Sequence, residues 1–394
     1  MVNAMSGVRV LEIAHYIAGP QCCQILADHG AEVIKVEPPA GESGRQAQPV
    51  HEGESFYFAA HNRNKRSISL DLRSDRGNEV LQDLIGWADV LVTNYANGVP
   101  ARLGFDFDEV RRINPRTVMV HITGFGQTGP YSSWVAYDGI IQAMSGLADM
   151  TGEPDGQPTI AGPFVADNVT GMQAAMGAML GLLARERTGR GQLIDVGMLD
   201  SMIPLLAHHL SVADAGLGEP TRWGSSLPTN YSGLYPTTDG WVYLAPITPR
   251  MWDAFSTVLG HPEWAERETA EPGWRVRERE QVDADVTEWT RTRTKDEVVE
   301  ALQSNGVVCG PVQSVNDLLS DPQVQRRGIT VPVPLSNGAH ATVPGPALRL
   351  SDTPARSPER PPQLGEHTDE VLTLVGHPPR KRTPGEDAAT EESS

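Results

Sequence analysis

Short apolar segments alternate with helical patterns over the first half of the chain. Runs rich in Val, Ile and Leu are typical of buried strands, and they fall at 8–14, 31–37, 90–93, 117–123 and 192–196. Between the first two, residues 21–29 predict a helix that ends at Gly30. Because strands and helices alternate at this spacing, the pattern predicts an α/β fold whose large domain contains a doubly wound parallel sheet.

The strongest helical pattern covers residues 167–187. Apolar side chains recur there at intervals of three and four, at Met172, Ala175, Met176, Met179, Leu180 and Leu183. Glycines at 171, 177 and 181 lower the helix propensity of the same segment. We therefore expect another backbone or a ligand to approach this helix closely at the glycines.

The pattern changes near residue 220, where charge-rich connections separate shorter elements. A turn precedes a strand at 241–244, and helices are predicted at 252–259 and within 283–303. We expect an N-terminal part of the large domain, a smaller α+β domain, a Pro-rich return to the large domain and a disordered tail, over 1–224, 225–325, 326–377 and 378–394.

Composition and charge exclude several classes of function. The 394 residues carry a formal net charge of −18, which disfavours binding to nucleic acid or to an anionic membrane. No apolar run is long enough to span a bilayer, and no secretory signal is visible at the N-terminus. Three cysteines cannot build a disulfide framework, and no metal-ligand spacing occurs, so we expect a cytoplasmic protein without a metal.

The segment 124–129 has the spacing G-x-G-x-x-G and follows a predicted strand. A dinucleotide site also needs a helix that opens at the third glycine, because the N–H groups of that helix hold the pyrophosphate. Pro130 and Tyr131 follow instead. We interpret the segment as a loop, with either a structural role or a backbone that approaches another ligand.

Asp167 stands at the start of the predicted small-residue helix. Aspartate is a favoured N-cap residue, so a capping role is one interpretation. The other is catalytic, because a carboxylate held anionic and oriented at a helix N-terminus can attack a thioester and form a covalent intermediate. The residue pattern leaves both interpretations open.

A basic segment at 62–76 interrupts the acidic chain with five basic and two acidic residues. It predicts either a solvated loop or an anion site. Coenzyme A carries a 3′-phosphate and a diphosphate, which arginine and lysine side chains bind. Asn94 and Arg102 follow the end of a nearby strand, where ligands bind in open α/β sheets.

Four stretches together resemble the class III coenzyme A-transferase family, which includes formyl-coenzyme A transferase, carnitine coenzyme A-transferase and the 2-methylacyl-coenzyme A racemases. The resemblance extends over residues 7–367. It is carried by VLEIAHYIAGP, GAEVIKVEP, NRNKRSISLD and the stretch from Asp167 to Met198, at 10–20, 30–38, 62–71 and 167–198. Each stretch is a weak signal alone, and their order and spacing make the match specific.

The resemblance implies a site and an assembly. It makes Asp167 the catalytic nucleophile, and it implies a coenzyme A or acyl site lined by His15, Ile17, Ala18, Leu70, Arg73, Asn94, Arg102, Tyr137 and Met198. It implies transfer of coenzyme A from an acyl-coenzyme A to a free carboxylic acid through aspartyl anhydride and thioester intermediates. It also implies a homodimer of interlocked rings.

One departure from the family bears on the reaction. The racemases of the family have Gly-His-Asp where this chain has Ala136, Tyr137 and Asp138. Tyrosine, with a pKa near 10 in water, is a poor base for a proton at C2 of an acyl group. A racemase or epimerase, which would need a base pair at 137 and 167, is the second hypothesis. A non-catalytic acyl-coenzyme A binding protein is the third, and the intact Asp167 argues against it.

Further departures bear on the substrate. Ile17 stands where the formyl and oxalate enzymes have glutamine, and residues 224–228 replace their glycine-rich lid, which argues against oxalate or formate as the substrate. Pro38 replaces a basic residue of some members, so that nucleotide contact is either missing or supplied by Arg45. The sequence leaves the donor and acceptor acids open.

Overall fold

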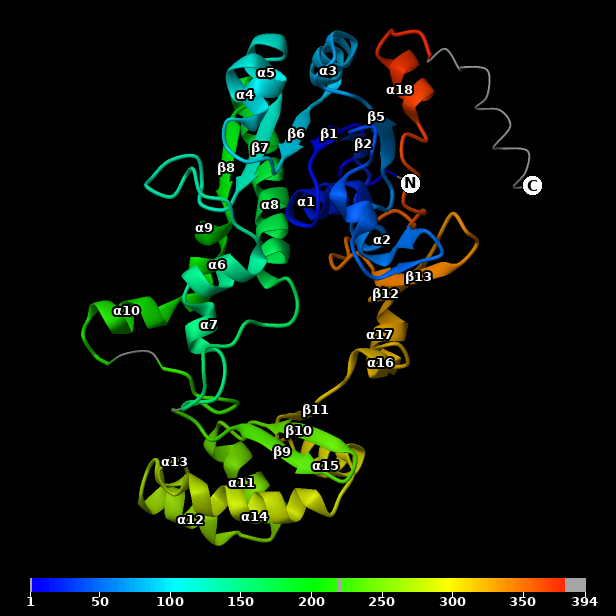
Figure 1. Ribbon diagram of the computed structural model, residues 1–394. Coiled ribbons are helices and arrows are strands. Elements are labelled where there is room, and N and C mark those ends of the chain that lie inside the picture. The colour runs from blue at the N-terminus through cyan, green and yellow to red at the C-terminus, as the bar shows by residue number, and fades with distance from the viewer. Residues whose placement is uncertain (1, 219–220, 228, 380–394) are drawn as a thin grey trace. The chain divides into compact units, whose positions relative to one another are not determined.

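A six-stranded parallel sheet organises the larger part of the chain. The computed structural model describes residues 2–218, 221–227 and 229–379 (Figure 1). The strand order is β5-β2-β1-β6-β7-β8, and every neighbouring pair is parallel. The strands are β1 (Arg9–Ile13), β2 (Glu32–Glu37), β5 (Arg66–Ser69), β6 (Val90–Thr93), β7 (Val118–Thr123) and β8 (Leu193–Gly197). The predicted α/β fold with a parallel sheet is confirmed.

The order of these strands reverses between β1 and β6. The chain builds the sheet outward from β1 through β2 to β5, and then returns to the other side of β1 with β6, β7 and β8. The loops after two such neighbouring strands leave in opposite directions, which opens a crevice at the carboxyl end of the sheet. The fold therefore predicts a ligand site beside the residues that follow β1 and β6.

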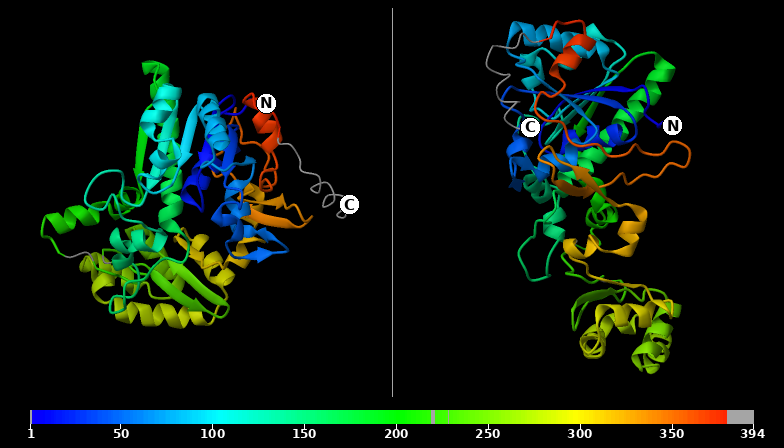
Figure 2. Two further views of the ribbon diagram at one scale, coloured as in Figure 1. Left: turned by 45° about the horizontal axis from the view of Figure 1, so that its top comes forward. Right: turned by 90° about the vertical axis from the view of Figure 1, so that its right-hand side faces the viewer.

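Helices cover both faces of the sheet (Figures 1 and 2). Leu11 and Ile13 of β1 belong to a core that includes α3 (Asp75–Trp87), α5 (Phe107–Ile113) and α18 (Thr368–Leu374). The opposite face carries α1 (Ala18–Asp28) and α8 (Val165–Thr188). The same unit contains η1 (Ser43–Gln46), β3 (Val50–His51), β4 (Glu54–Ser55), α2 (Phe56–Asn62), α4 (Val99–Leu103), α6 (Asp138–Met144), α9 (Met198–Met202) and η2 (Ile203–Leu206).

The long helix α8 packs through its small residues. A Cβ at Gly171 would lie 2.9 Å from the carbonyl oxygen of Ala18 in α1, and a Cβ at Gly181 would lie 2.6 Å from a methyl group of Val118 in β7. The expected close approach is confirmed. The large apolar side chains of the helix are exposed instead of buried, at Met172, Met176, Met179, Leu180 and Leu183. Among the described helices, α8 included, none combines the length and the apolar character needed to cross a membrane.

The C-terminal segment returns to the first unit. The hairpin of β12 (Thr330–Pro334) and β13 (His340–Pro344) packs on α2, where Val333 and Val343 join Ala59 in a small core. Further along, α18 lies beside β5 (Figure 1), and the N–H of His367 donates to the carbonyl oxygen of Ser67 at 2.9 Å. The predicted disordered tail lies outside the described residues from position 380 onward.

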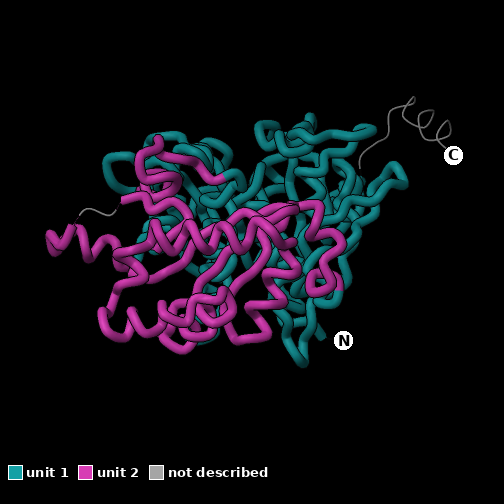
Figure 3. The backbone as a smooth tube through the Cα atoms, turned by 90° about the horizontal axis from the view of Figure 1, so that it is seen from below, with its two compact units in different colours: residues 1–145, 162–207, 326–394 teal, residues 146–161, 208–325 magenta. Residues whose placement is uncertain are grey.

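A second compact unit comprises residues 146–161 and 208–325 (Figure 3). Its antiparallel sheet has the order β11-β10-β9 and packs on helices through a core around Trp252 and Phe255. Its elements are α7 (Leu147–Met150), α10 (His208–Asp214), β9 (Gly233–Thr237), β10 (Gly240–Leu244), α11 (Pro249–Leu259), α12 (Glu263–Ala270), α13 (Trp274–Arg277), α14 (Arg279–Arg291), α15 (Lys295–Gln303), β11 (Cys309–Pro311) and α16 (Val315–Leu318), and α17 (Pro322–Arg327) crosses into the first unit. Residues 146–161 and 208–224, which the sequence placed in the large domain, group with this unit.

The contact between α1 and α8 leads to a stability prediction. Gly171→Ala should lower the free energy of unfolding by more than 1 kcal/mol, because the added methyl group meets the backbone of Ala18 and the helices must separate. The matched control is Gly86→Ala in α3, where the nearest atom is 4.0 Å away. That variant should be neutral or up to about 1 kcal/mol more stable, since alanine favours the helix. Urea unfolding of both variants measures the difference, and equal effects would contradict the close contact.

Candidate active site

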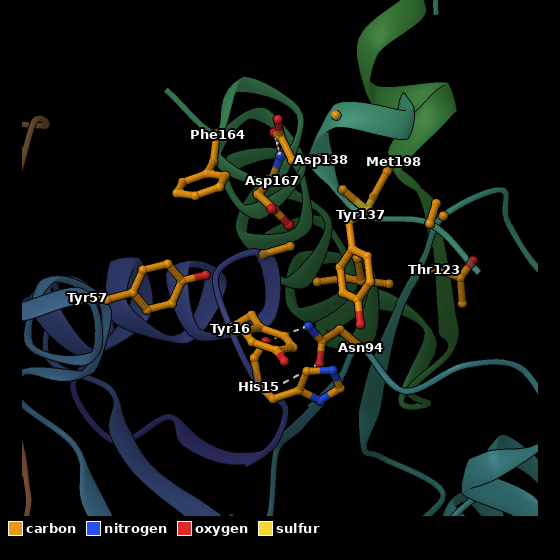
Figure 4. A pocket seen from close by; sticks show the side chains of 15 residues that line it. His15, Tyr16, Tyr57, Asn94, Thr123, Tyr137, Asp138, Phe164, Asp167 and Met198 are labelled. Atoms are coloured by element: carbon orange, nitrogen blue, oxygen red, sulfur yellow. Dashed lines mark hydrogen bonds between the residues drawn. The ribbon is translucent and has the colours of Figure 1, made fainter. Parts of the chain in front are cut away.

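A pocket of about 380 Å³ lies at the carboxyl end of the sheet, beside the switch between β1 and β6 (Figure 4). Its walls come from the turns after β1, β6 and β7 and from the first turns of α6, α8 and α9. The lining residues are His15, Tyr16, Ala18, Tyr57, Asn94, Ile122, Thr123, Gly124, Ala136, Tyr137, Asp138, Gly139, Phe164, Asp167 and Met198.

The side chain of Asn94 joins the two turns at the switch point. Its Oδ1 accepts from the N–H of His15 at 3.0 Å, and its Nδ2 donates to the carbonyl oxygen of His15 at 2.7 Å. Tyr16 follows in a left-handed conformation with φ +62°, which is unfavourable for a bulky residue. The two hydrogen bonds from Asn94 therefore hold a strained turn that presents His15 and Tyr16 to the pocket.

Buried charges anchor both ends of the same turn. Nζ of Lys35 donates to the carbonyl oxygen of Ala14 at 3.0 Å, and Nζ of Lys65 donates to that of Pro20 at 2.9 Å. Glu12 lies between the two lysines, 2.7 Å from Lys35 and 2.8 Å from Lys65. Burial alone would raise the pKa of Glu12, but the two ammonium groups lower it. Removing one partner would leave an uncompensated buried charge, which costs about 3–5 kcal/mol.

Glu42 extends this network to the middle of the turn. Its Oε2 accepts from the N–H of Tyr16 at 3.2 Å and from that of Gly44 at 2.6 Å, while Oε1 lies 3.4 Å from Nζ of Lys35. Arg45, the candidate for the nucleotide contact, pairs with buried Glu37 through two bonds of 2.6 and 2.7 Å. The Glu37 carboxylate would be left buried and unpaired without Arg45, so in this structure Arg45 neutralises a buried charge, and its contact with the nucleotide stays a prediction.

Asp167 is the third residue of α8, and the N-cap position belongs to Phe164. The capping interpretation of Asp167 is therefore wrong. The cap is Asp138, whose Oδ1 accepts from the N–H groups of Ala166 at 2.7 Å and Asp167 at 3.1 Å. Its Oδ2 accepts from Nε2 of Gln142 at 2.6 Å. Asp138 thereby fixes the helix end that carries Asp167 (Figure 4).

The helix dipole does not keep the carboxyl group of Asp167 fully ionised. Burial and the nearby Asp138 carboxylate raise its pKa to about 7, and the backbone N–H of Ala18 opposes the rise. The expected stabilisation of the anion by the helix N-terminus is therefore outweighed by desolvation. At neutral pH the group is divided between the acid and the carboxylate, and the carboxylate is more basic than that of an ordinary aspartate.

Aromatic side chains form the walls around this carboxyl group. Tyr57 and Phe164 meet edge to face with ring centres 6.0 Å apart, and Tyr16 and Tyr137 do so at 6.1 Å. In Figure 4 the first pair lies to one side of Asp167 and Tyr137 lies to the other. Burial and the charge of Asp167 raise the pKa of Tyr57, so its hydroxyl remains a hydrogen-bond donor at neutral pH.

A second cavity of about 800 Å³ lies in the same unit, and the ring of Tyr95, which lines it, is centred 5.3 Å from the ring of His15, which lines the first cavity. Leu70, Arg73 and Arg102 line the second cavity. Both arginines are exposed, so their guanidinium groups face solvent at its edge.

Much of the basic segment 62–76 is engaged within the fold. Arg63 pairs with Asp28 at 2.5 Å, and Arg66 pairs with Glu32 and Glu370. Lys65 is buried and pairs with Glu12, so three of the five basic side chains of the segment are paired within the fold. Arg73, also in this segment, lines the second cavity.

The predicted site residues divide between the two cavities. The first contains His15, Ala18, Asn94, Tyr137, Asp167 and Met198, and the second contains Leu70, Arg73 and Arg102. Ile17 lines neither cavity and is buried. Sequence reasoning missed Tyr16, Tyr57 and Phe164, for which no motif exists. It also missed the buried network, although Lys35 within an apolar strand was a visible signal.

Two further expectations concern loops and metals. The segment 124–129 is a loop, as predicted, and the next helix, α6, begins only at Asp138. The replaced lid belongs to the second unit up to Leu227, and Pro228 lies outside the described residues. Among residues 2–379, apart from the three that are not described, histidine, cysteine and carboxylate side chains form no cluster that could hold a metal.

Comparison with known proteins identifies the family. The model of CoA-transferase family III matches residues 5–368. The chain belongs to this family. The match covers the sheet, both cavities and the second unit, in agreement with the resemblance seen in the sequence.

Relatives of known name and structure support this assignment. Formyl-CoA:oxalate CoA-transferases from Rhodopseudomonas palustris and Bradyrhizobium diazoefficiens are 36% and 35% identical, over 95% of this chain and 94% of theirs. A crystal structure of a CAIB/BAIF family protein from Brucella suis is 34% identical with a TM-score of 0.87, over 95% of this chain and 100% of that one. A Mycobacterium tuberculosis protein is 28% identical with a TM-score of 0.83, over 94% and 99%.

The raised pKa of Asp167 predicts a pH-dependent effect of Asp167→Asn on stability. The folded-state pKa of about 7 lies above the ordinary value of 3.8, so the folded protein loses stability as pH rises through this interval. Each pKa unit corresponds to about 1.4 kcal/mol, so the advantage of the variant in Tm should grow by several degrees from pH 5 to pH 7 and then level off. Differential scanning calorimetry checks this. The control is Asp155→Asn, at an exposed position, whose Tm difference from wild type should not change with pH. A Tm difference for Asp167→Asn that is also independent of pH would contradict the raised pKa.

Proposed function

We propose that this CoA-transferase moves coenzyme A between an acyl-coenzyme A and a free carboxylic acid, with Asp167 as the covalent nucleophile. One observation carries the proposal: the Asp167 carboxyl group is partly buried in the pocket, beside Asp138, with its pKa raised to about 7. A desolvated carboxylate of raised basicity is a stronger nucleophile than one in water, yet it is still ionised in part at neutral pH.

Four exchanges complete the proposed reaction. A carboxylate oxygen of Asp167 attacks the donor thioester carbonyl, the C–S bond breaks, and a mixed anhydride and the thiolate form. The thiolate attacks the aspartyl carbonyl, which releases the donor acid and leaves an aspartyl thioester. The acceptor carboxylate displaces the thiolate to form a second anhydride, and the thiolate then takes the new acyl group and frees Asp167. No net proton is transferred, and exclusion of water protects both anhydrides from hydrolysis.

The two cavities suit the two parts of an acyl-coenzyme A. The second cavity has the larger volume and the exposed guanidinium groups of Arg73 and Arg102, which can bind phosphate. The first cavity holds Asp167, and apart from Asp138 its other lining side chains are uncharged or apolar, four of them tyrosine or phenylalanine. We therefore assign the nucleotide to the second cavity and the acyl group to the first.

The covalent mechanism predicts a trapped adduct. Incubation with a panel of acyl-coenzyme A thioesters, followed by hydroxylamine, should convert Asp167 to its hydroxamate, because hydroxylamine cleaves both the anhydride and the aspartyl thioester. Peptide mass spectrometry locates the modification. Asp167→Asn should retain coenzyme A binding, show no adduct and lose at least about 10³-fold in kcat, since its amide is a poor nucleophile.

Two outcomes would contradict the transferase proposal. Turnover by Asp167→Asn at the wild-type rate would exclude the covalent route. Exchange of the C2 proton of an acyl-coenzyme A in deuterated water, without any adduct, would support the isomerase instead. Tyr137 is the group that would have to act as the base there, and its side chain is 67% exposed.

A homodimer is the assembly that we propose. The outward face of α8 carries five large apolar side chains in a continuous helical stripe, at Met172, Met176, Met179, Leu180 and Leu183. Exposed apolar stripes of this kind are typical of obligate interfaces. We expect a second copy of the chain to cover this stripe, in agreement with the family resemblance. The interlocked arrangement of the two copies remains a prediction.

The stripe predicts the effect of charged substitutions on assembly. Met176→Lys and Leu180→Lys should convert a dimer to monomers, because each buries an unpaired ammonium group in the interface. Light scattering after size-exclusion chromatography measures the mass, and circular dichroism confirms that the variants fold. Glu186→Lys, at the exposed polar end of the same helix, is the control that should remain dimeric. A monomeric wild-type protein would overturn the proposal.

A further inference from the structure

The proposed acyl cavity contains two carboxyl groups and lacks a cation. Among its fifteen described lining residues, Asp138 and Asp167 are acidic and none is a lysine or an arginine. Burial lowers the pKa of the lining histidine, His15, so its ring is neutral at neutral pH. Lys35, beneath the turn, is fully buried and already shared between Glu12 and Glu42. A second negative charge on the substrate would therefore meet Asp138 without a compensating charge.

The same cavity has room and apolar surface for a bulky group. Its volume of about 380 Å³ is at the small end of ordinary ligand pockets and far exceeds the needs of a formyl or oxalyl group. Apolar and aromatic side chains dominate its walls: Tyr16, Ala18, Tyr57, Ile122, Ala136, Tyr137, Phe164 and Met198. Two edge-to-face pairs, Tyr57 with Phe164 and Tyr16 with Tyr137, present ring surfaces to the interior (Figure 4).

The tyrosine hydroxyl groups do not replace a cation. Tyr57 and Tyr16 can each donate one hydrogen bond to a carboxylate. The reacting carboxylate of the acceptor acid needs such donors itself, because it must be held beside Asp167 before it attacks. A second carboxylate would compete for the same neutral donors.

We infer that the acid handled at this site has a single carboxylate and a bulky uncharged body, either branched aliphatic or aromatic. The inference rests on the proposed transferase function and goes beyond it by naming the substrate class. It separates this chain from relatives named formyl-CoA:oxalate CoA-transferase. The feature that carries it is the combination of aromatic walls, two carboxyl groups and no cation around the described pocket.

Self-exchange between an acyl-coenzyme A and its own isotopically labelled free acid tests the inference without knowledge of the natural donor. Three pairs of acids match in shape and differ in charge, because an isopropyl group replaces a carboxylate. They are 2-methylpropanoate with oxalate, 3-methylbutanoate with malonate, and 4-methylpentanoate with succinate. Phenylacetate and 3-phenylpropanoate add aromatic bulk, and formate and acetate are the small acids of the panel. Mass spectrometry of the coenzyme A ester gives the exchange rate for each acid.

We expect each monocarboxylate to exchange at least tenfold faster than its matched dicarboxylate, and the aromatic acids to exchange at rates comparable with the branched ones. Equal or faster exchange of oxalate, malonate or succinate would overturn the inference. Exchange confined to formate or acetate, with none for the bulky acids, would overturn it as well.

A pair of variants at Phe164 tests the missing cation directly. This side chain is 48% exposed at the pocket, so it can be replaced without disturbing the core. Phe164→Arg should shift the rate ratio within each pair at least tenfold toward the dicarboxylate, since it supplies the missing positive charge. Phe164→Leu, which removes the ring without adding charge, should leave the ratio within about twofold of wild type. Equal ratios in the two variants would contradict the electrostatic argument.

Binding of the free acids separates failure of this inference from failure of the transferase proposal. Saturation-transfer NMR with the Asp167→Asn protein measures binding of each free acid, because this variant lacks the proposed nucleophile. Preferential binding of the monocarboxylates, in the absence of exchange by the wild-type protein, would overturn the transferase proposal and support the substrate class. Preferential binding of the dicarboxylates would overturn the class whether or not exchange occurs.

Discussion

A charge-balanced network beneath the turn after β1 is the constraint on which the site depends. Three carboxylates, from Glu12, Glu37 and Glu42, face three cations, from Lys35, Lys65 and Arg45. Buried ions are tolerated when they are paired and hydrogen-bonded, so the members of the network must be present together. The spare hydrogen bonds of the lysines and of Glu42 reach the backbone of residues 14, 16 and 20. The buried charges must stay paired, and the hydrogen bonds that they make to the backbone stabilise the strained turn.

A second constraint operates at the start of α8. The helix end needs an acceptor for its free N–H groups, and Asp138 provides one from the start of α6. The same carboxylate lies close enough to Asp167 to raise its pKa, so one residue both fixes and tunes the proposed nucleophile. The glycine and alanine face of α8 packs against α1, which brings Asp167 to the turn held by the buried network.

The position of the pocket follows from the order of the strands. Because β1 and β6 are neighbours whose connections leave in opposite directions, the residues after them enclose a crevice, and Asn94 bridges it. The aromatic walls come from segments far apart in sequence, near residues 16, 57, 137 and 164. Substitutions in these segments can change which acid the pocket accepts without altering the buried charge network, since the wall residues and the network residues are different side chains.

Apolar periodicity and the spacing of motifs are local properties, so the sequence was enough to predict the parallel α/β sheet, the α8 helix with its close-packed glycines, and the family. It also singled out Asp167, but one of its two interpretations, a capping role, was wrong: the side chain that caps the N-terminus of α8 is that of Asp138, from another element. Tertiary structure decided which basic residues of 62–76 are free, since Asp28, Glu12 and Glu370 meet them only in the fold. It also decided the pKa of Asp167, the outward turn of the apolar face of α8 and the aromatic walls. These properties depend on burial and on contacts between distant segments, which a linear pattern does not contain.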